Sequence, residues 1–215
     1  MLHQLKWTIL PVMLLALVSC ANAPTTPAPP TAPPISLITP GPQLTQSVVP
    51  ATLTGLAFNP TDESLLKVDA GGLFRFTFAK GAWEVISVPA DLGLTGLALN
   101  PDDPTQLYVS GLSVGVLKST DGGQNWTAVN NGLPTTKVSA LAMHSFRRET
   151  LYVWLWSDGI YRTEDGGLSW RRMPDEGPPD KDVQGLVHST LPGSMNTGWL
   201  YASTPSGAYM SMDCF

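Results

Sequence analysis

Two copies of one eight-residue pattern, 44 residues apart, constrain the fold of this chain more than any other feature. Ser119-Thr120-Asp121-Gly122-Gly123-Gln124-Asn125-Trp126 returns as Thr163-Glu164-Asp165-Gly166-Gly167-Leu168-Ser169-Trp170. The match extends upstream, where Leu107-Tyr108-Val109 corresponds to Leu151-Tyr152-Val153. A period in the forties with a strand-like run in each unit is typical of the blades of a β-propeller. The sequence therefore predicts an all-β propeller built of four-stranded blades.

The composition of the repeated pattern indicates a tight turn between two strands. A Gly-Gly pair adopts positive φ without steric cost, and an Asp carboxylate accepts hydrogen bonds from the N–H groups of a turn. A Trp after the turn can anchor the hairpin by burying its ring against a neighbouring sheet. We interpret one acid per unit as a structural device of the repeat. The predicted structural residues are Asp121, Gly123, Trp126, Asp165, Gly167, Trp170 and, at the start of a further copy, Asp213.

The pattern S/T-x-D-x-G-x-x-W resembles the Asp-box of the BNR repeat family of β-propellers. That family includes sialidases, xyloglucan-active glycoside hydrolases, sortilin-type receptors and photosystem II assembly factors. The resemblance covers the chain from about Leu53 to its C-terminus, and it implies the fold while saying little about function. In the resembled enzymes these boxes lie on hairpins away from the active site, which agrees with a structural role for Asp121 and Asp165.

Four repeat units can be aligned, over residues 53–83, 94–126, 138–170 and 183–215. Each opens with a run that alternates small and large residues, as expected of the inner strand of a blade. Asn-Pro at 59–60 and at 100–101 predicts a turn after the first two of these runs. No stretch combines a sustained helical period with helix caps, so we expect little helix.

The first and last units depart from the pattern, as terminal repeats often do. Unit one has Phe78 where the turn Asp belongs and Lys80 where a Gly belongs, so its hairpin is expected to turn through Gly81. Unit four stops two residues after Asp213, without its turn and outer strand. Two explanations are open: the propeller is incomplete, or the segment 44–49 folds back as the missing strand and closes a ring. We favour the incomplete propeller.

The N-terminal segment predicts export and lipidation. Lys6 precedes an apolar run over 7–18, which is too short to span a bilayer comfortably and suits a signal peptide. Leu17-Val18-Ser19-Cys20 resembles a bacterial lipobox, which implies a signal peptide over 1–19 and acyl chains on Cys20. The alternative is an ordinary secretory signal that is cut near Ala21 or Ala23. We expect a lipid-anchored extracytoplasmic protein, on the outer membrane or cell surface.

The residues after Cys20 form two regions of different composition. Pro, Ala and Thr dominate 20–42, which favours an extended polyproline tether. The repeat domain follows over 43–215 and is long enough for a sizeable core. Of 12 basic residues only Lys6 lies in the signal segment, so 11 remain against 17 acidic residues. This acidity argues against nucleic acid as a partner.

Candidate catalytic groups are few. The arginines do not fall at corresponding inner-strand positions, so the arginine triad that the resemblance to sialidases would require is absent. The xyloglucan-active relatives use two acids across a cleft between two propellers, and here the acids after the inner strands, such as Asp102 and Asp103, are interpreted as turn residues. His144 and His188 occupy related positions in units three and four, but too few further ligands accompany them for a metal site. We predict no catalytic residue, no metal and no cofactor.

The strongest candidate for a binding surface is an aromatic row. Strand alternation places Tyr152, Trp154 and Trp156 on one face, and with His144 and His188 they form a possible ligand or partner face. Such a row can stack on sugar rings or receive the apolar anchor of a protein. The competing interpretation, which we favour for this row, is packing between blades. The predicted function is non-catalytic binding or scaffolding of a protein or glycan, and the alternatives are a glycoside hydrolase or its truncated remnant, and a photosystem assembly factor.

Overall fold

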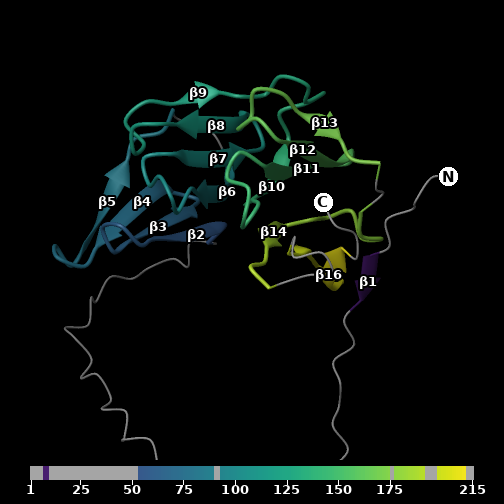
Figure 1. Ribbon diagram of the computed structural model, residues 1–215, viewed down its shortest axis with the longest axis horizontal. Coiled ribbons are helices and arrows are strands. Elements are labelled where there is room, and N and C mark those ends of the chain that lie inside the picture. Colours follow the sequence, from purple (N-terminus) through teal and green to yellow (C-terminus); the bar gives the residue numbers. More distant parts are fainter. Residues whose placement is uncertain (1–6, 10–52, 90–92, 175–176, 192–197, 212–215) are drawn as a thin grey trace, which may run out of the picture. The chain divides into compact units, whose positions relative to one another are not determined.

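The computed structural model of the protein describes residues 7–9, 53–89, 93–174, 177–191 and 198–211, and these form sixteen β-strands (Figure 1). Within these ranges there is no helix, and therefore none that is long and apolar enough to cross a membrane. The predicted lipidation site Cys20, the tether over 20–42, the segment 44–49 and Asp213 lie outside the described residues.

The strands form four antiparallel sheets of four strands each. Sheet 1 contains β2 (Gly55–Asn59), β3 (Ser64–Asp69), β4 (Gly72–Thr77) and β5 (Ala82–Ile86). Sheet 2 contains β6 (Leu94–Leu99), β7 (Leu107–Gly111), β8 (Gly115–Ser119) and β9 (Thr127–Ala128). Sheet 3 contains β10 (Val138–Met143), β11 (Leu151–Leu155), β12 (Gly159–Thr163) and β13 (Arg171–Arg172). Sheet 4 contains β14 (Gly185–His188), β15 (Leu200–Thr204), β16 (Gly207–Ser211) and β1 (Trp7–Ile9).

The sheets are the blades of a β-propeller, which confirms the predicted fold class. The first strand of each sheet lies beside that of the next, β2 by β6, β6 by β10 and β10 by β14. Figure 1 shows these inner strands near the middle, with the sheets fanning from left to lower right in chain order. One apolar core fills each of the three junctions between consecutive sheets.

One position of the repeat shows how the junctions are built. Leu107, Leu151 and Leu200 open the second strand of sheets 2, 3 and 4 in equivalent registers, and all three are fully buried against the preceding sheet. The equivalent residue of sheet 1 is Leu65, which pairs with Phe58 and is only partly buried. The same side chain is thus core at three positions and half-buried at the fourth, because no described sheet covers that face of sheet 1.

The outer strand of sheet 4 differs from both sequence-based expectations. It is neither missing nor supplied by 44–49, because β1 pairs antiparallel with β16, with Trp7 opposite Ser211 and Ile9 opposite Tyr209. A strand edge leaves unpaired N–H and C=O groups that accept any compatible extended segment, and Trp-Thr-Ile has high β propensity. The strand lies within the predicted signal peptide, so cleavage before Cys20 would remove it from the sheet.

The 119–126 and 163–170 turns are each centred on an aspartate. Oδ1 of Asp121 accepts hydrogen bonds from the N–H groups of Gln124 and Asn125, both at 2.9 Å, and from the hydroxyl of Ser119 at 2.8 Å. Asp165 repeats this arrangement, with the N–H of Ser169 at 2.9 Å and the hydroxyl of Thr163 at 2.6 Å. These acids therefore hold their own turns together.

Each of these turns is also tied to the sheet that precedes it. The indole N–H of Trp126 donates to the carbonyl of Ser87 at 3.0 Å, and that of Trp170 donates to the carbonyl of Val129 at 2.7 Å. Gly123 has φ 94°, and a Cβ there would lie 2.6 Å from Ile86 of sheet 1. Only glycine allows both the backbone conformation and this close approach.

The hairpin of unit one turns as the sequence predicted, by a different device. The N–H groups of Lys80 and Gly81 both donate to the carbonyl of Thr77, at 3.0 and 2.9 Å, and Gly81 takes φ 62°. Glycine therefore replaces the Asp-centred turn in this sheet, and β5 still pairs along its whole length with β4.

Candidate functional site

The candidate site is an opening at the end of the inner strands, of about 580 Å³, bordered by residues from all four sheets. Its apolar rim includes Leu112 and Trp156, which are 45% and 48% exposed. The polar residues that line it are Thr54, Thr95, Ser139, Asp182, Gln184 and Ser203. The opening thus combines a large exposed aromatic ring with hydroxyl and amide groups.

The rim residues are placed by equivalent hairpins. Trp156 follows β11, and its backbone N–H donates to the carbonyl of Lys137 at 2.9 Å. Leu112 follows β7, and its backbone N–H donates to the carbonyl of Gly93 at 3.1 Å. Lys137 and Gly93 each immediately precede the first strand of their sheet. The hairpin tip is therefore fixed to the inner strand, and the side chain at this position projects at the opening in sheets 2 and 3.

Four equivalent residues form the polar lining next to the inner strands. Thr54, Thr95 and Ser139 each donate a hydroxyl hydrogen bond to a carbonyl of the next sheet, at Leu94, Val138 and Val183, with lengths of 3.2, 2.8 and 2.7 Å. Gln184 stands at the fourth equivalent position, and its side-chain amide donates to Asp182 at 3.3 Å. These four residues occupy the same position near the start of each aligned repeat unit. Comparing that position across the four units would have located the site.

The acidic content of the opening limits its chemistry. Among its described lining residues, Asp182 is the one carboxylate. Hydrolysis of a glycosidic bond by the usual mechanism requires two carboxyl groups facing each other at roughly 5–9.5 Å. The described lining therefore holds groups that can bind a ligand and one carboxylate rather than a facing pair.

The predicted aromatic row is divided between core and surface. Tyr152 and Trp154 share a face, as alternation predicted, and both are buried in the junction between sheets 3 and 4. The Trp154 indole donates to the carbonyl of Lys181 at 3.2 Å, and a Cβ at Gly177 would lie 2.5 Å from its ring. In this arrangement Trp156 is the member of the row that a ligand can reach.

The two histidines, His144 and His188, lie against each other in a buried position. Their rings stack with centroids 4.0 Å apart, across the junction of sheets 3 and 4. Nδ1 of His144 accepts hydrogen bonds from the N–H groups of Phe146 and Arg147, at 3.0 and 3.2 Å. Nδ1 of His188 accepts the N–H of Ser145 at 3.1 Å. Both nitrogens are thus occupied as acceptors in turns.

This acceptor role is a property of the repeat. Asn59 and Asn100 stand at the position equivalent to His144, and their side-chain oxygens accept the N–H two residues later, both at 3.0 Å. Burial, reinforced by the positive charges of His188 and the nearby arginines, lowers the pKa of His144 to about 4. Burial also lowers the pKa of His188. The pair is therefore neutral at pH 7, and no cluster of three metal-ligating residues occurs in the described part of the chain.

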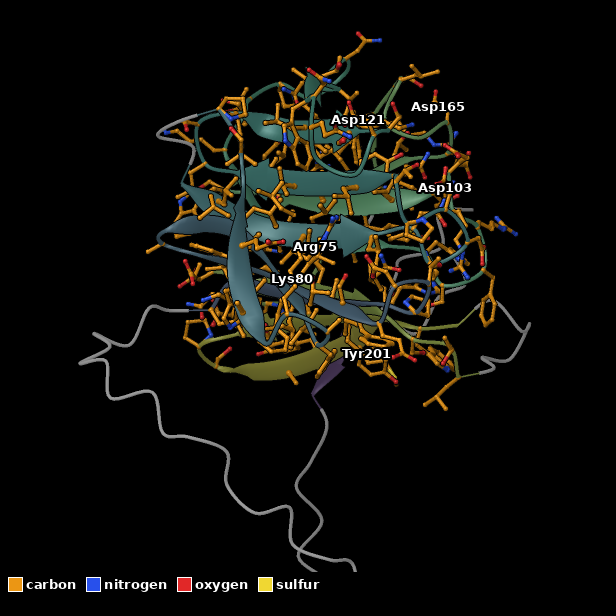
Figure 2. All side chains as sticks on the ribbon, turned by 90° about the vertical axis from the view of Figure 1, so that its left-hand side faces the viewer. Arg75, Lys80, Asp103, Asp121, Asp165 and Tyr201 are labelled. Atoms are coloured by element: carbon orange, nitrogen blue, oxygen red, sulfur yellow. The ribbon has the colours of Figure 1, made fainter. Side chains whose placement is uncertain are left out.

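The turn acids are poised as anions. Hydrogen bonds from Asn125 and Ser119 lower the pKa of Asp121 to about 2, and those from Ser169 and Thr163 do the same for Asp165. Figure 2 labels both residues, which lie at the outer hairpins of neighbouring sheets. A general acid needs a raised pKa, so these carboxylates suit turn stabilisation rather than proton donation.

Comparison with known proteins shows the fold and leaves the family open. No protein-family model and no curated protein matches the sequence. Among solved structures, the GH74 xyloglucanase from Xanthomonas campestris is similar with a TM-score of 0.60 and 20% identity, over 76% of this chain and 29% of that chain. The GH74 enzyme from Niastella koreensis gives 0.56 and 20%, over 76% and 28%.

A chain of the nidogen/laminin complex is also similar, with a TM-score of 0.54 and 16% identity over 73% of this chain and 62% of that chain. The protein spans less than a third of the length of the two GH74 enzymes. Identities this low establish the shared propeller fold alone, and function on a propeller depends on the site it carries.

Proposed function

We propose that this protein is a non-catalytic binding propeller, held outside the cytoplasm by acyl chains on Cys20, with its ligand against Trp156. The observation that carries the proposal is the opening at the inner strands, where an exposed indole stands beside hydroxyl and amide groups. The lipobox-like Leu17-Val18-Ser19-Cys20 sequence and the proline-rich 20–42 segment support an anchored and tethered position.

The chemistry of the opening favours a glycan over a protein as its ligand. An exposed indole offers a flat apolar face on which a sugar ring can stack, and Gln184 and Ser203 supply groups that pair with sugar hydroxyls. Asp182 adds an acceptor that can bind two hydroxyls at once. A protein anchor would favour a fully apolar pocket, whereas this opening sets polar side chains of all four sheets beside its apolar rim.

A glycoside hydrolase is the second candidate, because two of the similar structures are GH74 enzymes. The single carboxylate in the described lining argues against it. Release of reducing sugar by the purified protein from a glycan that it binds would overturn the non-catalytic proposal and favour the hydrolase.

Calorimetric titration with xyloglucan oligosaccharides, as the first probe of a panel of neutral glycans, tests the proposal. We expect binding that Trp156→Ala weakens by about tenfold or more, since a stacked aromatic contributes on the order of 1–2 kcal/mol. Phe146→Ala is the matched control, because Phe146 is comparably exposed but lies on the hairpin between β10 and β11, at the other end of these strands. Equal loss of affinity in both variants, or binding that Trp156→Ala leaves unchanged, would contradict the proposed site.

A further inference from the structure

The face of sheet 1 that points away from sheet 2 is apolar and uncovered. Leu56 is 56% exposed, although its equivalents Leu97 and Leu141 are buried in the junctions of sheets 2 and 3. Phe58, Trp83 and Val85 are exposed on the same face. Lys67 lies among them with its ammonium 4.9 Å from the Trp83 ring centroid and 2.7 Å from Asp69. Monomeric proteins rarely leave such a patch open.

The three internal junctions show what fits this face. In two of them, a leucine of the inner strand meets a glycine of the preceding sheet. A Cβ on Gly55 would lie 3.0 Å from that of Leu97, and a Cβ on Gly96 would lie 3.0 Å from that of Leu141. A leucine thus fills the space left by glycine at the junctions of sheets 1 with 2 and 2 with 3.

Sheet 4 carries the complementary space. Gly185 is equivalent to Gly55 and Gly96, and among the described residues the one atom within 4 Å of a Cβ built there is the hydroxyl oxygen of Ser203 in its own sheet. Around it, Val187 is exposed, while Tyr201 and Met210 are partly exposed. Their equivalents in sheet 3, such as Tyr152, are buried against the next sheet. The free leucine and the free glycine therefore belong to the two ends of the same chain.

The hydrogen bonds that join the sheets stop at the same place. Thr54, Thr95 and Ser139 each donate to the carbonyl just before the equivalent residue of the next sheet. By this rule Gln184 would donate to the carbonyl of Leu53 in a sheet equivalent to sheet 1. Its side-chain amide instead donates to the neighbouring Asp182 at 3.3 Å. Figure 1 shows sheets 1 and 4 at opposite ends of the fan, and in the described residues β2 and β14 do not make the extensive contact that joins the inner strands at the other junctions.

We propose that a second copy of this chain closes the ring, with sheet 1 of each copy packed on sheet 4 of the other. Leu56 of one copy then fills the space beside Gly185 of the other, and Gln184 reaches the carbonyl of Leu53. The leucine contact repeats one that the fold makes at two junctions, and the hydrogen bond repeats one that it makes at three, so they need no new kind of surface. Two identical head-to-tail interfaces related by a two-fold axis form a closed assembly of eight sheets. The opening at the inner strands becomes part of a channel that both copies line.

Sedimentation velocity of the full chain carrying Cys20→Ser, which prevents acylation, tests the proposal. We expect a single species of twice the 23.0 kDa chain mass at micromolar concentration. Leu56→Asp and Gly185→Val should each shift it to the monomer mass, because the first places a charge in the junction and the second fills the space for leucine. Leu168→Asp is the matched control, since Leu168 is 71% exposed on the 163–170 turn, and it should keep the dimer. A monomeric parent protein, or larger open-ended assemblies, would overturn the proposal.

A cross-link distinguishes closure by a second copy from closure within one chain. With Cys20 and Cys214 both changed to Ser, cysteines introduced at Leu56 and Gly185 should form disulfides between chains under mild oxidation. The oxidised protein should then run at twice the chain mass on a non-reducing gel. Oxidation that leaves the monomer mass, with both thiols consumed, would mean that the chain closes on itself and would overturn the proposal. Counting free thiols separates closure within one chain from a result in which the cysteines stay unoxidised. Free cysteines would also overturn the proposal.

Discussion

At the scale of the residue, His144 shows how a repeat can change its side chain and keep its hydrogen bond. Nδ1 of the imidazole takes the place of the amide oxygen of Asn59 and Asn100, and each accepts the N–H two residues later. The replacement adds a ring that stacks on His188, and it also introduces a titratable group into the junction of sheets 3 and 4. Stability should therefore depend on pH in a way that an asparagine would not produce.

The direction of this dependence follows from the lowered pKa values. His144 titrates at about 4 in the folded protein and near 6.5 in the unfolded chain. Above pH 7 both states are neutral, and between pH 6.5 and 4 the unfolded chain binds the proton first. The free energy of unfolding should thus fall by about 1–2 kcal/mol from pH 7 to 5, and His188 should add to the loss.

Urea unfolding at several pH values measures this effect, with His144→Asn as the test variant. Asparagine restores the acceptor found in the other units and removes the titration, so the loss from pH 7 to 5 should shrink. The slope with pH is compared rather than the stability at one pH, because the lost stacking lowers stability throughout. The low pKa values of Asp121 and Asp165 place their effect below this window. An unchanged slope in His144→Asn would show that His144 titrates equally in both states.

At the scale of the element, the strands and turns that belong to the repeat could be predicted from the sequence. The strand β1, which has no counterpart in the repeat, could not. The 119–126 and 163–170 hairpins were predictable because Asp, Gly-Gly and Trp act within the turn or on the adjacent sheet. The sequence marks Trp156 as a candidate binding residue, but it does not show that Tyr152 and Trp154 of the same row are buried. Strand alternation predicts the face on which a side chain lies and not what covers that face. The pairing of β1 with β16 spans about 200 residues, and no local pattern encodes it.

The segment Trp7–Ile9 has two roles that exclude each other. It forms the outer strand β1 of sheet 4, and it lies inside the predicted signal peptide that cleavage would remove. We expect the membrane-bound form to begin at an acylated Cys20, which intact-mass spectrometry of the extracted protein measures. Loss of β1 leaves β16 as an edge strand, so its amide hydrogens should exchange on the order of tenfold faster than in the unprocessed Cys20→Ser chain. The amides of β11, buried within sheet 3, serve as the internal control. Two outcomes would contradict the anchor. The first is that the membrane-bound protein keeps residues 1–19. The second is that the Cys20→Ser protein is cut at the same site as the parent protein and is released from the membrane.

At the scale of the whole molecule, stability is distributed along the fan of sheets. Among the described residues each sheet packs extensively on its neighbours in chain order, so sheets 2 and 3 are covered on both faces while sheets 1 and 4 are each covered on one. Stability in such an array approximates a sum over neighbouring junctions. The same position of the four sheets is occupied by a leucine, so substitutions there report on each junction with the same side chain. These leucines are Leu65, Leu107, Leu151 and Leu200.

Substitution of each of these leucines by alanine should therefore separate junctions that the chain makes alone from the one that needs a partner. Leu107→Ala, Leu151→Ala and Leu200→Ala should each cost about 2–5 kcal/mol, because a fully buried leucine leaves a cavity. Leu65→Ala should cost about 1 kcal/mol in dilute protein, where its face meets water, and more as the concentration rises and a second copy covers it. Urea unfolding of the four variants across a hundredfold range of concentration measures both effects. A cost at Leu65 that equals the others at every concentration would mean that its face is already covered within one chain, and a cost that stays small would mean that nothing covers it.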